Sequence, residues 1–92
     1  MRIRWTPAAV HNFSHICDYT EEKHGVSAAR SLALQIHEAI TRLAEFPRMG
    51  RPGHKPGTRE LIFTGTPFLA IYRVREDVVE ILRILHGAQK WP

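Results

Sequence analysis

The chain lacks the cysteines of a disulfide framework and the hydrophobic runs of a membrane protein. Its single cysteine, Cys17, cannot form an intramolecular disulfide or supply the paired thiolates of a structural zinc site, and we expect it to pack in the core. No apolar run approaches the roughly 18–20 residues that span a bilayer. The N-terminal sequence MRIRWTP has basic residues but no apolar segment after them, which argues against a secretory signal. We therefore expect a cytoplasmic protein that does not associate with membranes.

Motifs for metal or nucleotide binding are also missing. His11 and His15 are four residues apart on a predicted helix and could share a metal with Asp18. However, the glutamate of the His-Glu-x-x-His zinc motif is absent, and no third strong ligand is evident. The glycines of residues 47–57 do not form a phosphate-binding motif ahead of a helix. We therefore expect no metal and no cofactor, and we assign the two histidines to a solvated helix face.

The length and composition predict one globular domain over residues 1–92. Hydrophobic residues make up 43% of the chain and charged residues 24%, which is ordinary for a globular protein and argues against disorder. The formal charge of +4 is unevenly distributed, because residues 1–46 carry five basic and five acidic side chains while residues 47–92 carry eight and four. The positive second half indicates an anionic or macromolecular target, or else it only supports solubility.

The first part of the chain predicts a short strand followed by a long helix. Residues 1–5 alternate arginine with hydrophobic side chains at the period of two that is typical of a strand. Thr6 then suits an N-cap, and Pro7 suits the first helical position, where its missing N–H costs nothing. This helix should run to His24 and end at Gly25.

A second helix and a loop follow. Ser27 is the expected N-cap, and apolar residues then recur at spacings of three and four up to Phe46. Pro47 should end this helix because it has no backbone N–H to donate. Residues 47–57 contain three prolines, three glycines and no acidic residue, which predicts a loop. The two helices, joined by a Gly-Val linker, should form an antiparallel hairpin.

The remaining sequence predicts three strands, at Thr58–Phe63, Phe68–Val74 and Val78–His86. The order β-α-α-β-β-β describes an α+β domain in which the helices cover one face of the sheet and leave the other partly open. In the middle strand, Arg73 lies on the face opposite the apolar one. The last strand mixes polar and apolar residues on both faces, so its orientation stays open.

These three strands carry Arg59, Arg73, Arg83 and His86. Strands rich in β-branched and aromatic residues normally contribute side chains that pack in the core. A row of cations on such strands, on an open sheet, therefore indicates an anionic or macromolecular target. His86 could also act as a general acid or base, because a histidine titrates near working pH. The structural alternative is a strand-end histidine that is hydrogen-bonded to a carbonyl.

Short motifs along the whole chain are shared with a known group of proteins. They are Trp5 with Ala8, Gly50-Arg51, Gly57-Thr58-Arg59-Glu60-Leu61, Tyr72-Arg73-Val74 and Ile81-Leu82-Arg83-Ile84-Leu85-His86-Gly87. In these motifs the chain resembles the RelE/ParE superfamily, the toxins of bacterial type II toxin–antitoxin modules. The resemblance implies a twisted antiparallel sheet with a two-helix hairpin packed on one face. It also implies a cognate antitoxin, encoded by the adjacent gene, as partner.

The superfamily holds two known activities, and the resemblance implies different roles for the same residues in each. One branch cuts messenger RNA in the ribosomal A site, and in such a nuclease His86, Arg73 and Arg59 would be catalytic. The other branch inhibits DNA gyrase and is not known as an enzyme of its own. For either target, gyrase or the ribosome with its mRNA, the predicted binding residues are Arg59, Arg73, Arg83, His86, Lys90 and Trp91.

The chain departs from the nuclease pattern in three places. The arginine that nucleases carry on the middle strand falls at Leu69, their acidic base falls near Met49-Gly50, and Trp91-Pro92 stands in place of a terminal catalytic tyrosine. The long first helix also resembles the gyrase branch. We therefore favour a ParE-like gyrase inhibitor over a RelE-like, ribosome-dependent mRNA endonuclease. A non-toxic, small basic nucleic-acid-binding module is a further alternative.

Overall fold

The elements of the chain follow the predicted order in the computed structural model, which describes residues 1–87. In this part of the chain they are β1 (Arg2–Trp5), α1 (Pro7–His24), α2 (Val26–Thr41), the 3₁₀ helix η1 (Arg42–Ala44), β2 (Arg51–Pro52), β3 (Arg59–Ile62), β4 (Phe68–Arg75) and β5 (Val78–His86). The predicted α+β fold is confirmed, and the predicted bounds of the first helix and the last strand are correct. The two-residue strand β2 lies inside the segment that was expected to be entirely loop.

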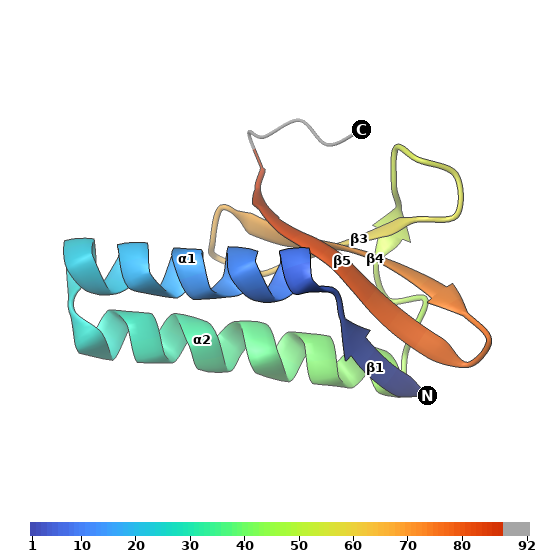
Figure 1. The fold of residues 1–92 in the computed structure, drawn as a ribbon, viewed down its shortest axis with the longest axis horizontal. Coiled ribbons are helices and arrows are strands. Elements are labelled where there is room, and N and C mark those ends of the chain that lie inside the picture. Colours follow the sequence, from blue (N-terminus) through green and yellow to red (C-terminus); the bar gives the residue numbers. More distant parts are fainter. Residues whose placement is uncertain (88–92) are drawn as a thin grey trace.

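The strands described form one sheet in the order β1-β5-β4-β3-β2 (Figure 1). The pairs from β2 to β5 are antiparallel, as expected, but β1 pairs with β5 in parallel, so the sheet is mixed. A parallel pair needs a long crossover between its strands, and the two helices with the following strands provide it. The last strand in sequence, β5, therefore lies inside the sheet, between β1 and β4.

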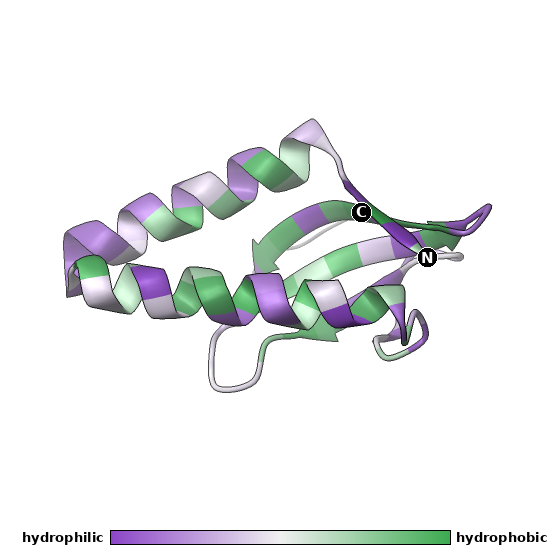
Figure 2. Ribbon diagram, turned by 90° about the horizontal axis from the view of Figure 1, so that it is seen from below, coloured by the Kyte–Doolittle hydropathy of each residue, from purple (hydrophilic) through white to green (hydrophobic). Residues whose placement is uncertain are grey.

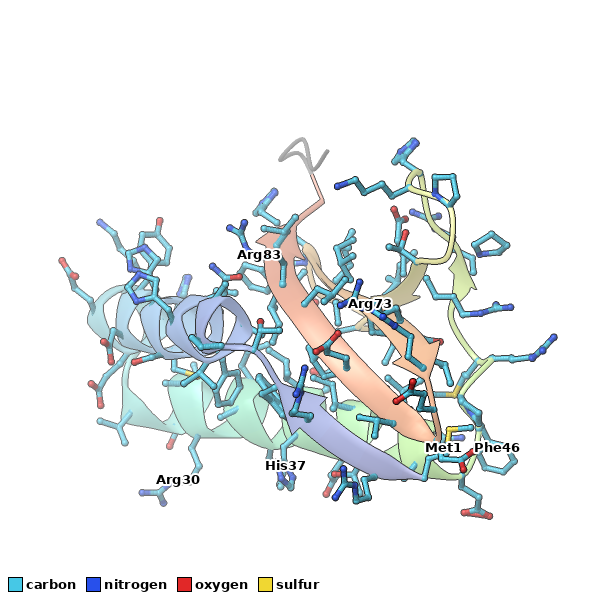
Figure 3. All side chains as sticks on the ribbon, turned by 45° about the vertical axis from the view of Figure 1, so that its right-hand side comes forward. Met1, Arg30, His37, Phe46, Arg73 and Arg83 are labelled. Atoms are coloured by element: carbon cyan, nitrogen blue, oxygen red, sulfur yellow. The ribbon has the colours of Figure 1, made fainter. Side chains whose placement is uncertain are left out.

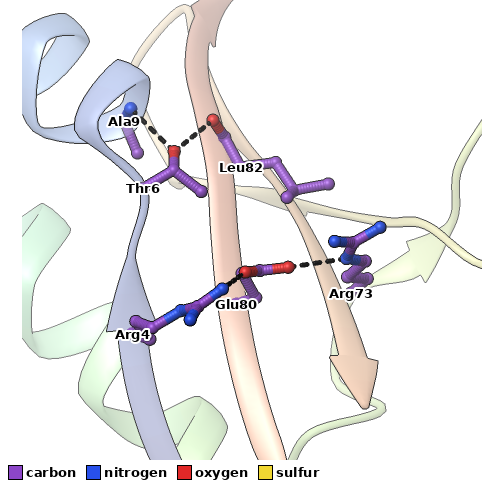
Figure 4. Close-up of polar contacts among 6 residues, drawn as sticks. All are labelled: Arg4, Thr6, Ala9, Arg73, Glu80 and Leu82. Carbon is purple, nitrogen blue, oxygen red and sulfur yellow. Dashed lines mark hydrogen bonds and ion pairs between the residues drawn. The ribbon is translucent and has the colours of Figure 1, made fainter.

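The start of α1 is tied directly to β5. The Thr6 Oγ1 atom accepts a hydrogen bond from the Ala9 N–H at 3.1 Å, which is the predicted N-cap, and donates one to the Leu82 carbonyl at 2.8 Å (Figure 4). Pro7 occupies the first turn, and the Gly25 N–H donates to the Glu21 carbonyl at the other end of the helix. One hydroxyl thus fixes the helix start against the sheet.

The predicted bounds of the second helix were wrong at both ends. Gly25, whose φ is 92°, is both the C-cap of α1 and the N-cap of α2. Ser27 therefore lies inside α2, and no side chain caps the start of this helix. Only a glycine adopts this conformation without strain, which allows so short a reversal. At the other end, α2 stops at Thr41 and η1 continues to Ala44, and Phe46 is 50% exposed instead of buried.

The helical hairpin covers one face of the sheet, as predicted, and extends past the end of the sheet (Figure 1). Figure 2 shows more hydrophobic residues along α2 than along α1. The buried cluster between helices and sheet consists of Ala9, Ile16, Ile36, Ile40, Leu43, Leu61, Phe63, Ala70, Tyr72, Val79, Ile81 and Ile84. No helix within residues 1–87 has the length and apolar content to cross a membrane.

A β-bulge explains why the polarity pattern of the last strand could not be interpreted. Tyr72 pairs with Ile81 but Ile71 pairs with Arg83, so Leu82 has no partner of its own across the strands. The extra residue shifts the alternation by one, and Ile84 returns to the core face with Ile81. Leu82 consequently falls out of the alternation, between Ile81 of the core and Arg83, whose side chain is hydrogen-bonded to Asn12 of α1.

Replacing the hydroxyl of Thr6 should weaken the whole fold. We expect Thr6→Ala to lower the free energy of unfolding by about 1–2 kcal/mol, because the helix loses its cap and the Leu82 carbonyl loses its donor. Urea unfolding measures this change. Thr41→Ala is the matched control, since the Thr41 hydroxyl donates only to a carbonyl of its own helix, and an equal loss in both variants would contradict the proposed role.

Candidate functional site

The structure does not bring the predicted site residues together. Arg59 pairs with Tyr72 on the core face of the sheet, whereas Arg73 pairs with Glu80 on the opposite face. Arg83 pairs with Ile71, two residues from Arg73 on β4, but its side chain is hydrogen-bonded to Asn12 of α1 and not to Glu80, and Figure 3 shows the two arginine side chains on either side of the β5 ribbon. Lys90 and Trp91 lie outside the residues that the structure describes. The strand cations therefore form three separate environments.

The outer face of the sheet carries a triad of charges. Glu80, which is 6% exposed, accepts a hydrogen bond from Arg73 Nε at 2.6 Å and forms a second ion pair with Arg4 of β1 (Figure 4). Placing one buried carboxylate between two guanidinium groups offsets the cost of desolvating it. Arg73 is thus engaged within the fold, and its side chain is only partly available to a target.

Arg59 helps to hold the segment after η1. The fully buried Tyr72 hydroxyl donates to the Pro47 carbonyl at 2.8 Å and accepts from the Gly50 N–H at 2.9 Å. Arg59 Nη1 donates to the Gly50 carbonyl at 2.7 Å, so both polar groups of the Gly50 backbone are satisfied by side chains. A side chain at position 50 would collide with Tyr72, because its Cβ would lie 2.7 Å from the Tyr72 ring.

The environment of Tyr72 keeps its hydroxyl protonated. Burial raises the pKa of Tyr72 above its usual value, while the Gly50 hydrogen bond and the nearby Arg59 charge act in the opposite direction. Next to this network, Arg51 of β2 pairs with the buried Glu60 of β3 at 2.9 Å. Three motifs that are distant in sequence, around positions 50, 60 and 72, therefore meet in one hydrogen-bonded network.

Arg83 lies against α1. Its Nε donates at 2.8 Å to the Asn12 side-chain carbonyl, which also accepts from the Ile84 N–H at 3.1 Å. The strand β1 pairs with β5 only as far as Ile81. Asn12 therefore supplies an acceptor to the part of the β5 edge that β1 does not reach.

His86 borders a cleft of about 750 Å³ at the far end of the hairpin. Its ring packs edge-on against Phe68, with 5.8 Å between the ring centroids. Among residues 1–87, the cleft combines four histidines and two aromatic rings with small polar and apolar residues, and no acidic, lysine or arginine side chain of these residues lines it. Its lining residues are His11, Asn12, His15, Ile16, Tyr19, Thr20, His24, Leu32, Gly65, Thr66, Pro67, Phe68, Ile84 and His86.

The remaining reactive side chains do not form a site. Over residues 1–87 no group of three histidine, cysteine or acidic side chains could hold a metal ion. His11 and His15 stack with 6.5 Å between their ring centroids. Burial, and secondarily the negative charge of Asp18, raise the pKa of the Cys17 thiol, which disfavours a nucleophilic thiolate. An arrangement of general base, phosphate-binding cation and general acid is not assembled around His86 in the described part of the chain.

Sequence patterns alone did not identify Asn12, Tyr72 and Glu80 as key positions. Tyr72 was expected on the core face, but its hydroxyl partners lie more than twenty residues away in sequence. Glu80 stands between apolar residues on a strand, where a buried carboxylate implies cationic neighbours. The expectation that a buried carboxylate is paired with a cation would have predicted an arginine partner for Glu80, but it would not have identified which arginine.

Comparison with known proteins gives a consistent result. Residues 3–91 match the family model described as the ParE toxin of the type II toxin–antitoxin system parDE. The Sinorhizobium fredii protein Y4kP is 43% identical over 99% of this chain and 93% of its own length. Toxin RelE2 of Caulobacter vibrioides is 33% identical over 96% of this chain and 97% of its own length.

A solved structure agrees with the computed fold. The chromosomal ParDE system from P. aeruginosa contains a chain with a TM-score of 0.85 and 31% sequence identity. The match covers 94% of this chain and 95% of that one. The architecture is therefore shared almost from end to end.

Removing the Tyr72 hydroxyl should destabilise the fold without leaving a cavity in the core. We expect Tyr72→Phe to lower the free energy of unfolding by about 1–3 kcal/mol, because the Gly50 N–H and the Pro47 carbonyl would stay buried without partners. Chemical denaturation measures the loss. Tyr19→Phe, at a site that is 54% exposed, should change it by less than about 0.5 kcal/mol.

The pH dependence provides a second readout of the same hydroxyl. Because the folded pKa of Tyr72 is raised, its contribution is fully present below the unfolded pKa of about 10 and is lost as the pH rises through the folded pKa. The wild type should therefore lose more stability above about pH 10 than Tyr72→Phe does. Identical alkaline profiles would argue against a buried, neutral Tyr72.

Proposed function

This chain belongs to the ParE toxin family of type II toxin–antitoxin systems, and we propose that it stops growth by inhibiting DNA gyrase. A cognate antitoxin from the adjacent gene would neutralise it. In this proposal the chain acts by binding and is not an enzyme of its own. Its target-binding residues are drawn from Arg59, Arg73, Arg83, His86, Lys90 and Trp91.

The dispersal of the strand cations is the observation that carries this proposal. A metal-independent nuclease needs a general base, a general acid and a cation at one phosphate. Here Arg59 and Arg73 lie on opposite faces of the sheet, and each is engaged within the fold. The 18-residue length of α1 supports the same choice, because a long first helix resembles the gyrase branch.

A cognate antitoxin is supported by the likeness to the P. aeruginosa ParDE system. It is also supported by Phe46 and Met49, two exposed hydrophobic side chains that line one surface cleft, since contiguous exposed apolar surface generally marks an interaction site. The other large hydrophobic side chains that are exposed in the described chain are Met1, Val10, Tyr19, Val26, Leu34 and Ile62.

RelE-like cleavage of ribosome-bound mRNA is the second candidate function. The similarity to toxin RelE2 of C. vibrioides over almost the whole chain favours it. In that case His86 would act as acid or base, with phosphate contacts from Arg73 and Arg59 after a rearrangement of their present hydrogen bonds. The two candidates differ in which macromolecule is altered first in the cell.

Induced expression separates the two candidates directly. We expect growth arrest, a change in plasmid supercoiling within the first minutes, and intact reporter mRNA over the same interval. Coexpression of the neighbouring gene should restore growth. Early site-specific mRNA cleavage with unchanged supercoiling would replace the gyrase proposal with the nuclease one, and normal growth at full expression would contradict both.

His86 gives a sharper distinction between binding and catalysis. We expect His86→Gln to change the concentration needed for gyrase inhibition by less than about tenfold, because a contact residue contributes only part of an interface. Loss of a general acid or base would instead reduce cleavage by about 10²–10⁴-fold. Purified variants can be compared in a supercoiling assay and in a ribosome-dependent cleavage assay, and a loss of cleavage of about 10²–10⁴-fold in the second assay would make His86 catalytic.

A further inference from the structure

The outer face of the sheet repeats one arrangement of arginines in two successive rungs. In the first rung Arg4 of β1 and Arg73 of β4 both stand opposite Glu80 of β5. In the second rung, two residues along each strand, Arg2 and Arg75 both stand opposite Val78. These side chains, together with Glu76, line a cleft of about 330 Å³. We call Arg2, Val78 and Arg75 the open rung.

The first rung shows how this geometry holds a carboxylate. The outer strands of three neighbours are roughly 9.5–10 Å apart, so guanidinium groups from both sides can reach inward to a group on the middle strand. Glu80 accepts from Arg73 through one oxygen and pairs with Arg4 through the other. Each carboxylate oxygen therefore has its own arginine.

The open rung has the same two arginines but no carboxylate. Within residues 1–87, neither Arg2 nor Arg75 forms a side-chain hydrogen bond or ion pair, and both are exposed. Val78 offers only methyl groups between them. Glu76 lines the same cleft but makes no ion pair with either arginine. An anion from outside could therefore take the position that corresponds to Glu80.

We propose that the open rung binds a carboxylate of an acidic side chain on the antitoxin, held between Arg2 and Arg75 over Val78. This inference rests on the proposed function, because it assigns a contact to the antitoxin. A bound carboxylate would lie roughly 6.5–7 Å from that of Glu80, which is the distance between alternate residues of a strand. Four arginines around the two carboxylates would offset their mutual repulsion.

A protein carboxylate suits this site better than a nucleic-acid backbone. Nucleic-acid binding draws its affinity from many phosphates along a positive groove. Here Glu76 and Asp77 form the adjoining β4–β5 turn, and Glu76 lines the same cleft, so a phosphate chain crossing the open rung would also pass negative charges. The cleft has the size of one or two side chains and is too small for a strand of nucleotides.

Affinity measurements with charge-matched variants test the site. We expect Arg2→Gln/Arg75→Gln to weaken binding of the purified antitoxin about 2- to 30-fold, the range for two solvent-exposed ion pairs. The double variant should also lose part of the salt dependence of the wild type. Lys23→Gln/Arg30→Gln removes the same charge from the two helices, with Arg30 projecting from α2 away from the sheet (Figure 3), and should change the affinity less than twofold.

A second variant fills the site from within. Val78→Glu places a carboxylate between Arg2 and Arg75, as Glu80 lies between Arg4 and Arg73, and should weaken antitoxin binding to a similar extent while keeping the melting temperature. Wild-type affinity in both variants would overturn this inference and leave the proposed function intact. Weaker binding to gyrase-bound DNA with unchanged antitoxin affinity would assign the open rung to phosphate and also overturn it. Failure of the wild type to bind the antitoxin would refute the partner and the site together.

Discussion

The structure depends on how the exposed edge of β5 is satisfied. The parallel partner β1 ends at Trp5, opposite Ile81, and beyond this point the backbone groups of β5 would face α1 without partners. Thr6 and Asn12 supply the missing hydrogen bonds, to the Leu82 carbonyl and from the Ile84 N–H. Since buried backbone groups must be paired, these two contacts fix where α1 crosses the sheet. The β-bulge lies between them, and it directs Ile81 and Ile84 toward the helices.

Local signals in the sequence predicted most of the fold, while long-range pairing decided the rest. Thr6, Pro7 and Gly25 act within one helical turn, and the bounds of α1 followed from them. The parallel β1–β5 pair joins residues that are more than seventy positions apart, and the bulge depends on the register of β4 against β5, so no local pattern reports either of them. The candidate site was less predictable still. Strand alternation places Arg59 and Arg73 on opposite faces only once the register of each strand is known.

The motifs that carry the family resemblance are largely structural in this chain. Gly50, Arg59 and Tyr72 share one hydrogen-bonded network, and Arg51 pairs with Glu60 beside it. Replacing any of these side chains removes a buried or half-buried hydrogen bond, which explains how a sequence pattern can report the fold and leave the target undetermined. Specificity for a target must then come from surface positions outside the network, such as the cleft beside His86, and recognition of the antitoxin from positions such as the open rung.

The position of β5 inside the sheet has a consequence for biosynthesis. Residues 78–86 are the last strand in sequence but lie between β1 and β4 in the sheet. Contacts of such high sequence separation form slowly, and until this strand has been synthesised the nascent chain exposes two strand edges and the apolar side of its helices. The ribosome must therefore finish nearly the whole domain before any of it can fold. Incomplete products would be open to proteolysis, so translation that is aborted early should release no folded toxin.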